Sequence, residues 1–386
     1  MMKLTFPALV FPGAARALAF LLATWPASSD AQSSVTFYGV LDAGVTYVSN
    51  TGGASVVKFD DGVSYGNRWG IKGREDLGGG MAAVFALESG FRLGNGKLGF
   101  GGAQFGRQAY AGLSHPWGTV SFGNQLDMTQ EMVSSYNISA WASGYAIHQG
   151  DLDRFNGDRM PHALKFLSNE FAGFKFGGMF SFGGIAGDFQ RNSAYSFGAH
   201  YANGPFTVGA AYTQLNPPHG IYAFDPYAML GTATFSGKPV ISIDPASGTV
   251  TDLYASKPFP VERQATFGAG SSYQIGDVTL MGNFSLTTIH ALDVSSQMTV
   301  LEGGALWQIT PALSAIGGYQ HSRFEGHHWN QGSLGLHYLL SKRTEMYVSG
   351  DYLKASAGVN AVTGYSFTPS STASQANARL GVRHSF

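Results

Sequence analysis

A strict alternation of side-chain character constrains this chain more than any other feature. In the segment that begins at Arg68, basic residues occupy alternate positions at Arg68, Lys72 and Arg74, whereas Trp69 and Ile71 fall between them. Successive side chains of a β-strand point to opposite faces, so this segment presents one basic and one apolar face. A buried sandwich core rarely carries three basic residues on one strand face. A barrel with lipid outside and water inside requires this pattern.

Composition agrees with a large all-β protein that has two chemically different faces. The chain has 386 residues, of which 53 are Gly and none is Cys, and only 12% are charged, against about 25% in an ordinary soluble domain. No run of about 18 apolar residues follows residue 31, which excludes ordinary transmembrane helices. The net charge of −1 gives no electrostatic reason to expect nucleic acid as a partner.

The first 31 residues have the layout of a secretory signal peptide. Lys3 and Arg16 are basic, residues 17–23 form an apolar core, and Ser29 and Ala31 place small residues at the −3 and −1 positions of a cleavage site. The alternative is a short amphipathic or anchoring helix. We therefore expect an exported protein with a signal peptide at 1–31 and a single barrel domain at 32–386.

Short and long connections alternate along the rest of the chain. Tight turns are expected at 77–80, 115–118, 203–204, 275–277 and 341–343, and long polar loops at 94–103, 125–159, 182–193, 216–262, 288–296, 323–330 and 356–375. Outer-membrane barrels have short periplasmic turns and long external loops. The spacing corresponds to about 16 strands, enough to leave an aqueous channel.

Several ordered motifs resemble the Gram-negative general-diffusion porin family. They are SSVTFYGVLDAG from Ser33, RWGIKGREDLGGG from Arg68, FGRQAYAGLS from Phe105, YLLSKRT from Tyr338 and GVRHSF ending at Phe386. The resemblance implies a 16-stranded antiparallel transmembrane β-barrel with a third loop folded into the lumen. It also implies a homotrimer in the outer membrane of a Gram-negative bacterium that passes ions and small hydrophilic solutes by passive diffusion. Such a protein is not an enzyme and has outer-membrane lipid and the barrel assembly machinery as partners.

The same resemblance suggests a charged pore constriction. Its basic side comprises Arg68, Lys72, Arg74, Arg107 and Arg159, and its acidic side, on the third loop, comprises Asp127, Glu131, Asp151, Asp153 and Asp158. Fixed charges in a narrow channel sort ions and orient dipolar solutes. The alternative is that these are ordinary solvated residues of the lumen. The resemblance further assigns the terminal Phe386 to the signal that the assembly machinery reads.

Two positions are less regular. A strand over residues 105–114 would place Arg107, Ala109 and Ala111 on the lumen face, with Gln108 facing outward. After Arg159, Pro161 departs from the family pattern and has no backbone N–H to donate to the neighbouring strand. The direction in which the side chain of Arg159 points is therefore left open.

Other functions have weaker support. A barrel with a binding track for a sugar or carboxylate is an alternative, and an outer-membrane hydrolase is a less favoured one. His321, Glu325, His327 and His328 form the one metal-like cluster, which we interpret as an external loop. The segment 94–99 matches the dinucleotide pattern G-x-G-x-x-G, but a strand-like segment rather than a helix follows it. We expect no metal and no cofactor.

Overall fold

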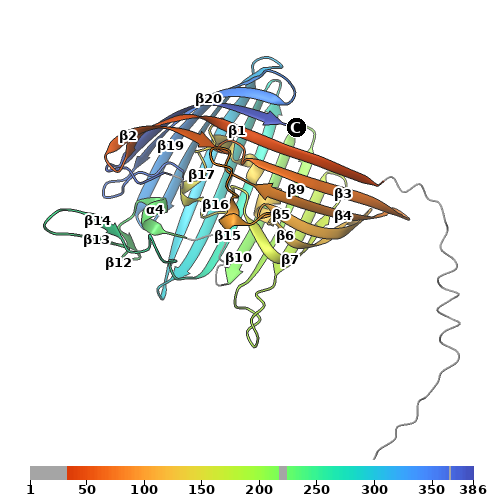
Figure 1. Cartoon of the computed structure of the whole chain (residues 1–386), viewed down its shortest axis with the longest axis horizontal. Helices are drawn as coiled ribbons and strands as arrows, with labels where there is room; N and C mark the ends of the chain where they lie inside the picture. Colours follow the sequence, from red (N-terminus) through yellow and green to blue (C-terminus); the bar gives the residue numbers. More distant parts are fainter. Residues whose placement is uncertain (1–32, 217–223, 365–366) are drawn as a thin grey trace, which may run out of the picture.

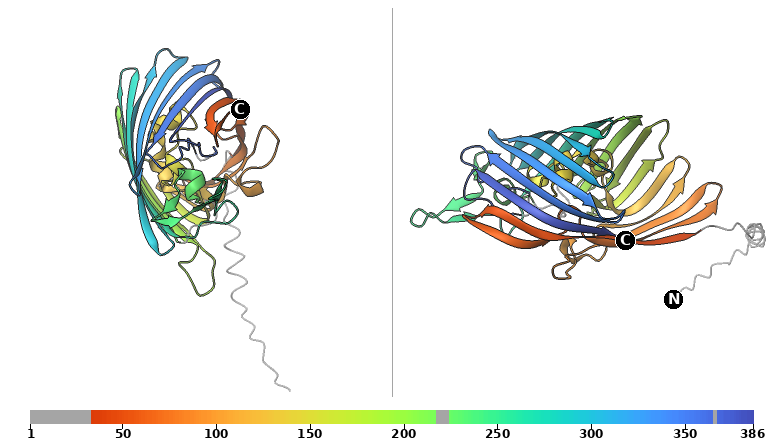
Figure 2. Two further views of the ribbon diagram at one scale, coloured as in Figure 1. Left: turned by 90° about the vertical axis from the view of Figure 1, so that its left-hand side faces the viewer. Right: turned by 90° about the horizontal axis from the view of Figure 1, so that it is seen from above.

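The chain folds into a closed antiparallel β-barrel. The computed structural model describes residues 33–216, 224–364 and 367–386, so the expected signal peptide lies outside the described residues. One sheet holds 17 strands, and pairing of β1 with β21 closes it. β2 and β3 occupy successive parts of the same position beside β1, which gives the barrel 16 strand positions (Figures 1 and 2). The predicted fold class is confirmed.

The wall is uneven in height. Its first strands are β1 (Ser34–Thr51), β2 (Ala54–Asp61), β3 (Arg68–Gly78), β4 (Met81–Gly90), β5 (Gln108–His115), β6 (Gly118–Leu126), β7 (Arg159–Ser168), β8 (Phe174–Ser181), β9 (Ser193–Asn203) and β10 (Phe206–Asn216). The remaining strands are β15 (Val261–Ile275), β16 (Val278–Ala291), β17 (Val294–Gln308), β18 (Leu313–Phe324), β19 (His327–Leu339), β20 (Thr344–Ala355) and β21 (Ser374–Ser385). Strands β4 to β8 have 8–10 residues, whereas β15 to β20 have 12–15.

Alternate residues along each strand face the membrane or the lumen. Large apolar side chains on the outer face stay exposed, as Phe122 (62%) and Leu334 (72%) illustrate. On β5, Ala111 pairs with Phe122 and therefore faces outward, whereas Gln108 pairs with the lumen residue Glu88. The expected faces of Gln108, Ala109 and Ala111 were wrong because the ladder begins at Gln108. Arg107 lies before the ladder, where alternation does not hold, and its side chain contacts Glu88 in the lumen as expected.

The connections only partly follow the expected alternation. The end of the barrel with short turns includes the predicted turn at 77–80. At the opposite end, the expected long loops at 288–296 and 323–330 are two-residue turns, at Leu292–Asp293 and at Glu325–Gly326. All four turn residues have positive φ, which suits tight hairpins between twisted strands. Polar strand ends there were misinterpreted as loops.

The long fifth loop, between β10 and β15, covers the mouth of its own barrel. It carries α4 (Pro226–Leu230) and two small hairpins, β11 (Thr234–Phe235) with β12 (Lys238–Pro239) and β13 (Ile241–Ile243) with β14 (Val250–Asp252). Phe235 and Phe259 pack with Phe324 and Trp329, which belong to the inner wall. Among the described residues, no helix is long and apolar enough to cross a membrane.

Candidate functional site: the channel lumen

The third loop, defined here as residues 127–158, lies inside the barrel (Figure 2). Its short helices are α2 (Met128–Met132), η2 (Ser134–Tyr136), α3 (Ile138–Ala142) and η3 (Gln149–Asp151). Asp127 caps α2 by accepting the backbone N–H of Gln130 at 2.9 Å, and Asn137 caps α3 by accepting that of Ala140 at 3.1 Å. These caps let five-residue helices form where propensity alone would not support them.

Glycines of the inner wall make room for this loop. A methyl group at Gly209, Gly270, Gly304, Gly318 or Gly335 would collide with the third loop, which therefore lies directly against the strand backbones from β10 to β19. The high glycine content thus has a specific structural use. The loop crosses about half of the barrel circumference in close contact with the wall.

The middle of the third loop, at residues 143–145, is hydrogen-bonded to strands at and near the seam of the barrel. Tyr145 donates to Asp60 at 2.5 Å and lies 2.9 Å from the hydroxyl of Thr46. Ser143 donates to Asp351 at 2.6 Å. The loop also meets residues 62–67, an insertion between β2 and β3, because a side chain at Gly144 would collide with the backbone of this insertion. The middle of the loop is therefore fixed to the wall.

Most acidic residues of the third loop are buried and paired. Asp127 is 0% exposed and accepts the Nε–H of Arg154 at 2.7 Å, and a carboxylate oxygen of Asp158 lies 3.7 Å from the same guanidinium. Asp151, which is 4% exposed, has its pKa raised because burial and the neighbouring Asp158 disfavour its charged form. These carboxylates hold the loop together from within.

A second buried group joins the loop to β17. The side chain of His148 is fully buried, with Nδ1 2.5 Å from Asp153 and Nε2 3.0 Å from Glu302. Burial alone would lower the pKa of His148, but the two carboxylates outweigh it and raise this pKa to about 10. Ser285 donates to Asp153 at 2.5 Å and the backbone N–H of Ser139 donates to Glu302 at 2.6 Å. His148 is therefore a buried cation between two anions.

The expected acidic side of the constriction needs correction. Asp127, Asp151 and Asp153 are each less than 5% exposed, so they do not present charge to a solute. Asp158 also turns toward Arg154, and its side chain is 12% exposed. Only Glu131 remains substantially open, at 22%, and it accepts a hydrogen bond from Lys165 at 2.6 Å. Loop acids were misassigned because a sequence does not show which side of a loop meets the wall.

The basic side, in contrast, retains charge that faces the lumen. Arg68 and Arg107 both approach Glu88, at 3.9 and 2.7 Å, and their side chains are 24% and 15% exposed. Tyr38 donates at 3.0 Å to Oε2 of Glu88, the oxygen that Arg68 approaches, whereas Arg107 contacts Oε1. One carboxylate thus serves two arginines.

Arg159 lies behind these two and is 8% exposed. Its guanidinium donates to the backbone carbonyls of Arg107 and Gly157, and its centre lies 5.0 Å from the ring of Phe100, which also lies 5.8 Å from the centre of the Arg107 guanidinium. Pro161 falls in a shift of register between β6 and β7, so the ladder accommodates its missing donor. Arg159 therefore joins the other arginines despite the altered motif.

Comparisons with known proteins decide the family. The Gram-negative porin family matches residues 17–358. The chain is a Gram-negative porin. It is 31% identical to an outer membrane porin protein of Bordetella pertussis, over 87% of this chain and 93% of that one. It is 26% identical to outer membrane porin protein 32 of Delftia acidovorans, over 96% and 98% of the two chains.

A solved structure agrees in fold. An anion-selective porin from Comamonas acidovorans superimposes with a TM-score of 0.73 at 23% identity, covering 92% of this chain and all of that one. The molecule is accordingly an outer-membrane porin, a channel for passive diffusion. The family consists of channels rather than enzymes.

Two expected basic residues of this porin lie away from the arginine group. Lys72 and Arg74 share the lumen face of β3 with Arg68, as predicted, and both are exposed. A strand rises about 3.3 Å per residue, so Arg74 lies roughly 20 Å from Arg68, toward the short-turn end. Lys72 lies over the ring of Tyr38, 5.5 Å from its centre.

The histidine cluster of the porin is a strand feature rather than a loop. His321 lies in β18, and His327 and His328 lie in β19, on either side of the tight turn. Glu325 accepts the backbone N–H of Ser236 in the fifth loop at 2.7 Å. In the part of the chain that the structure describes, no group of three His, Cys, Asp or Glu is placed to hold a metal ion.

Sequence reasoning missed several residues of the lumen. Glu88 is the one acid within β4, on the face opposite Leu87, and that pattern was available in the sequence. Phe100, Arg154 and His148 offered no comparable signal, because irregular loops give no periodicity from which to infer contacts.

Proposed function

We propose that this porin favours anions, and that the group of Arg68, Arg107 and Arg159 is its selectivity site. Among the described residues, Glu88 is the one carboxylate within 4 Å of Arg68 and Arg107, and Arg159 has no carboxylate within that distance. In a narrow channel with low-dielectric walls, this surplus of positive charge attracts anions and repels cations. That imbalance is the observation on which the proposal rests.

The acidic residues of the third loop do not cancel this field. Asp127 is paired with Arg154, Asp153 with His148 and Glu131 with Lys165. Asp151 is buried, and burial together with the neighbouring Asp158 raises its pKa and disfavours its charged form. The structural neighbour from Comamonas acidovorans is an anion-selective porin, which supports the same preference. The channel then acts on charge and size alone, without catalysis.

Single-channel recording in a planar bilayer tests the proposal. In a gradient of potassium chloride, we expect ohmic conductance steps and a reversal potential whose sign corresponds to anion preference. High salt should reduce the preference, since it screens the exposed part of the charge. A reversal potential on the cation side would refute the selectivity, while an absence of conductance would refute the open channel itself.

We further propose the orientation, assembly and export of the porin. The end with long loops faces outside, the turn at Gly78–Gly80 faces the periplasm, and residues 1–31 are a cleaved signal peptide. A tag in the exposed hairpin of β13 and β14 should be labelled on intact cells, whereas a tag at Gly79 should not be.

The assembled unit is proposed to be a homotrimer embedded in outer-membrane lipid and inserted by the barrel assembly machinery. The ring of Phe386 lies on the membrane side, 39% exposed and 5.6 Å from that of Phe37. This position suits the expected role in assembly. Removal of Phe386 should lower the yield of folded trimer in the membrane, and an unchanged yield would contradict this role.

A further inference from the structure

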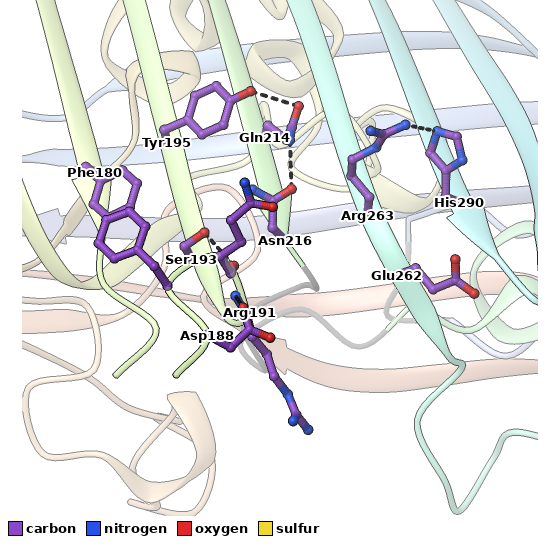
Figure 3. Close-up of a pocket in the computed structure, with 12 residues that line it drawn as sticks. Phe180, Asp188, Arg191, Ser193, Tyr195, Gln214, Asn216, Glu262, Arg263 and His290 are labelled. Atoms are coloured by element: carbon purple, nitrogen blue, oxygen red, sulfur yellow. Dashed lines mark hydrogen bonds between the residues drawn. The ribbon is translucent and has the colours of Figure 1, made fainter. Parts of the chain in front are cut away.

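An open pocket of about 710 Å³ lies on the outer surface of the barrel, at the long-loop end of β8 to β10, β15 and β16 (Figure 3). Its strand residues include Tyr195, Gln214 and Arg263. Their chain neighbours Ser196, Thr213 and Gln264 contact the third loop inside the barrel. Because alternate residues face opposite sides, the pocket opens toward the membrane and not toward the channel.

A polar hydrogen-bonding array forms the middle of the pocket. The hydroxyls of Tyr195 and Tyr212 both donate to the side-chain oxygen of Gln214 at 2.9 Å, and the amide of Gln214 donates to Asn216 at 2.7 Å. Further down the same outer face are apolar residues such as Phe197 and Phe267, 55% and 41% exposed. A polar array above an apolar band marks the level of lipid headgroups.

Two arginines of the pocket have no carboxylate partner among the described residues. Arg263 lies 2.5 Å from Nε2 of His290, and neither Arg263 nor Arg191 has a carboxylate oxygen within 4.0 Å among the described residues. The two nearby acids are engaged elsewhere, because Asp188 accepts the backbone N–H of Arg191 and Glu262 that of Asp293. The guanidinium groups are therefore available to an anion.

An aromatic surface borders the same pocket. The rings of Phe180 and Phe189 stack with centres 5.3 Å apart, and Phe189 is 70% exposed. Flat apolar rings beside amides and guanidinium groups suit a ligand with both apolar faces and polar edges. A sugar that carries phosphate has this chemistry, since its ring packs on an aromatic plane and its phosphate accepts from guanidinium groups.

We propose that this pocket binds the phosphorylated saccharide headgroup of a glycolipid in the outer leaflet. The sideways opening assigns the ligand to the membrane, because a pocket for a free solute would open on the channel or on the aqueous end. The proposal rests on the orientation inferred above, but not on the ion preference. Binding would place the sugar against the fourth loop, between β8 and β9, and against the start of β15.

The test uses folded porin in detergent with diphosphorylated lipid A as probe and native mass spectrometry as readout. We expect the wild type to retain the probe, and the double variant R191Q/R263Q to lose about tenfold in affinity, since charge-assisted hydrogen bonds are removed. Arg323→Gln is the matched control. Arg323 is exposed near the long-loop end, and its Nε–H donates to His321 at 2.9 Å, which resembles the contact between Arg263 and His290, but Arg323 does not line the pocket.

Several outcomes would overturn the proposal. These are equal affinity in the double variant, an equal loss in the Arg323→Gln control, displacement of the probe by inorganic phosphate alone, and a cross-link showing that a second copy fills the pocket. Conductance should be unchanged in all variants because the pocket lies outside the lumen. A conductance change would reveal a misfolded barrel, so failure of this proposal and failure of the channel function are distinguishable.

Discussion

The two charged regions of the lumen differ in what surrounds their charges. On the wall of β3 to β5, Arg68 and Arg107 share one carboxylate and remain partly open. In the third loop, Arg154 and His148 are buried, and each has two carboxylates within 4.0 Å. Charge that acts on solutes must be exposed and in excess, whereas charge that holds a loop must be buried and compensated. The same residue types therefore serve selectivity in one region and rigidity in the other.

The largest effect is expected from Arg154→Met. The change would leave Asp127 and Asp158 without their buried cation, and breaking such a pair costs about 3–5 kcal/mol. We expect faster hydrogen exchange across the third loop while the barrel strands remain protected. Glu131→Gln is the control, because Glu131 is partly exposed, a glutamine keeps an acceptor for Lys165, and Lys165 also donates to the carbonyl of Leu126, so the effect should be smaller. Equal rates of hydrogen exchange in the two variants would contradict the view that the buried pairs, and not the partly exposed one, hold the third loop.

A pH dependence sharpens the comparison. Since the folded-state pKa of His148 is raised to about 10 from 6.5, its contribution to stability is complete below about pH 6.5 and is lost as pH rises through about 10. Limited proteolysis within the third loop should therefore accelerate over that range. His148→Gln should be cleaved readily at all these pH values, with a flatter profile. A wild-type profile that is flat up to pH 10.5 would show that the buried cation does not hold the loop.

The opposite behaviour is expected of Arg107→Glu. This substitution acts on a partly exposed charge in a group where two arginines share one carboxylate, so the reversal potential in a salt gradient should shift toward cation preference. The fold should persist because lumen substitutions tune selectivity more than they affect the barrel. Arg74→Glu makes the same charge change nearer the short-turn end and should shift the potential less. Equal shifts would mean that Arg107 is not at the narrow point.

The smallest effect is expected from Phe100→Ala. Its ring lies against the guanidinium groups of Arg107 and Arg159, and such contacts contribute about 0.5–1 kcal/mol at exposed sites. We expect a slightly higher conductance and a small loss of anion preference because the arginines become more mobile. Leu98→Ala, in the same loop, should leave both unchanged. A large loss of folded protein in Phe100→Ala would instead show that this ring is needed for the stability of the fold.

Periodicity explains how far sequence reasoning reached in each region. The basic face of β3 was predictable because Arg68, Lys72 and Arg74 are held two residues or a multiple of two apart on one regular strand. The faces of β5 were wrong by one position, because Gln108 and not Phe105 begins the ladder. A period of two carries no information about its own starting residue, so an error of one reverses every face within the ladder. Arg107, which precedes the ladder, still reaches the lumen.

The amino-acid sequence alone determined the barrel, its membrane-facing and lumen-facing alternation and the basic character of its early strands. These properties follow from local patterns that the backbone must obey wherever the strand lies. Only the tertiary structure decided which charges reach the channel. Asp127 and Glu131 are four residues apart in one loop, yet the former is enclosed beside Arg154 and the latter is open beside Lys165. That difference arises from how the third loop packs on glycines of distant strands, which no local pattern encodes.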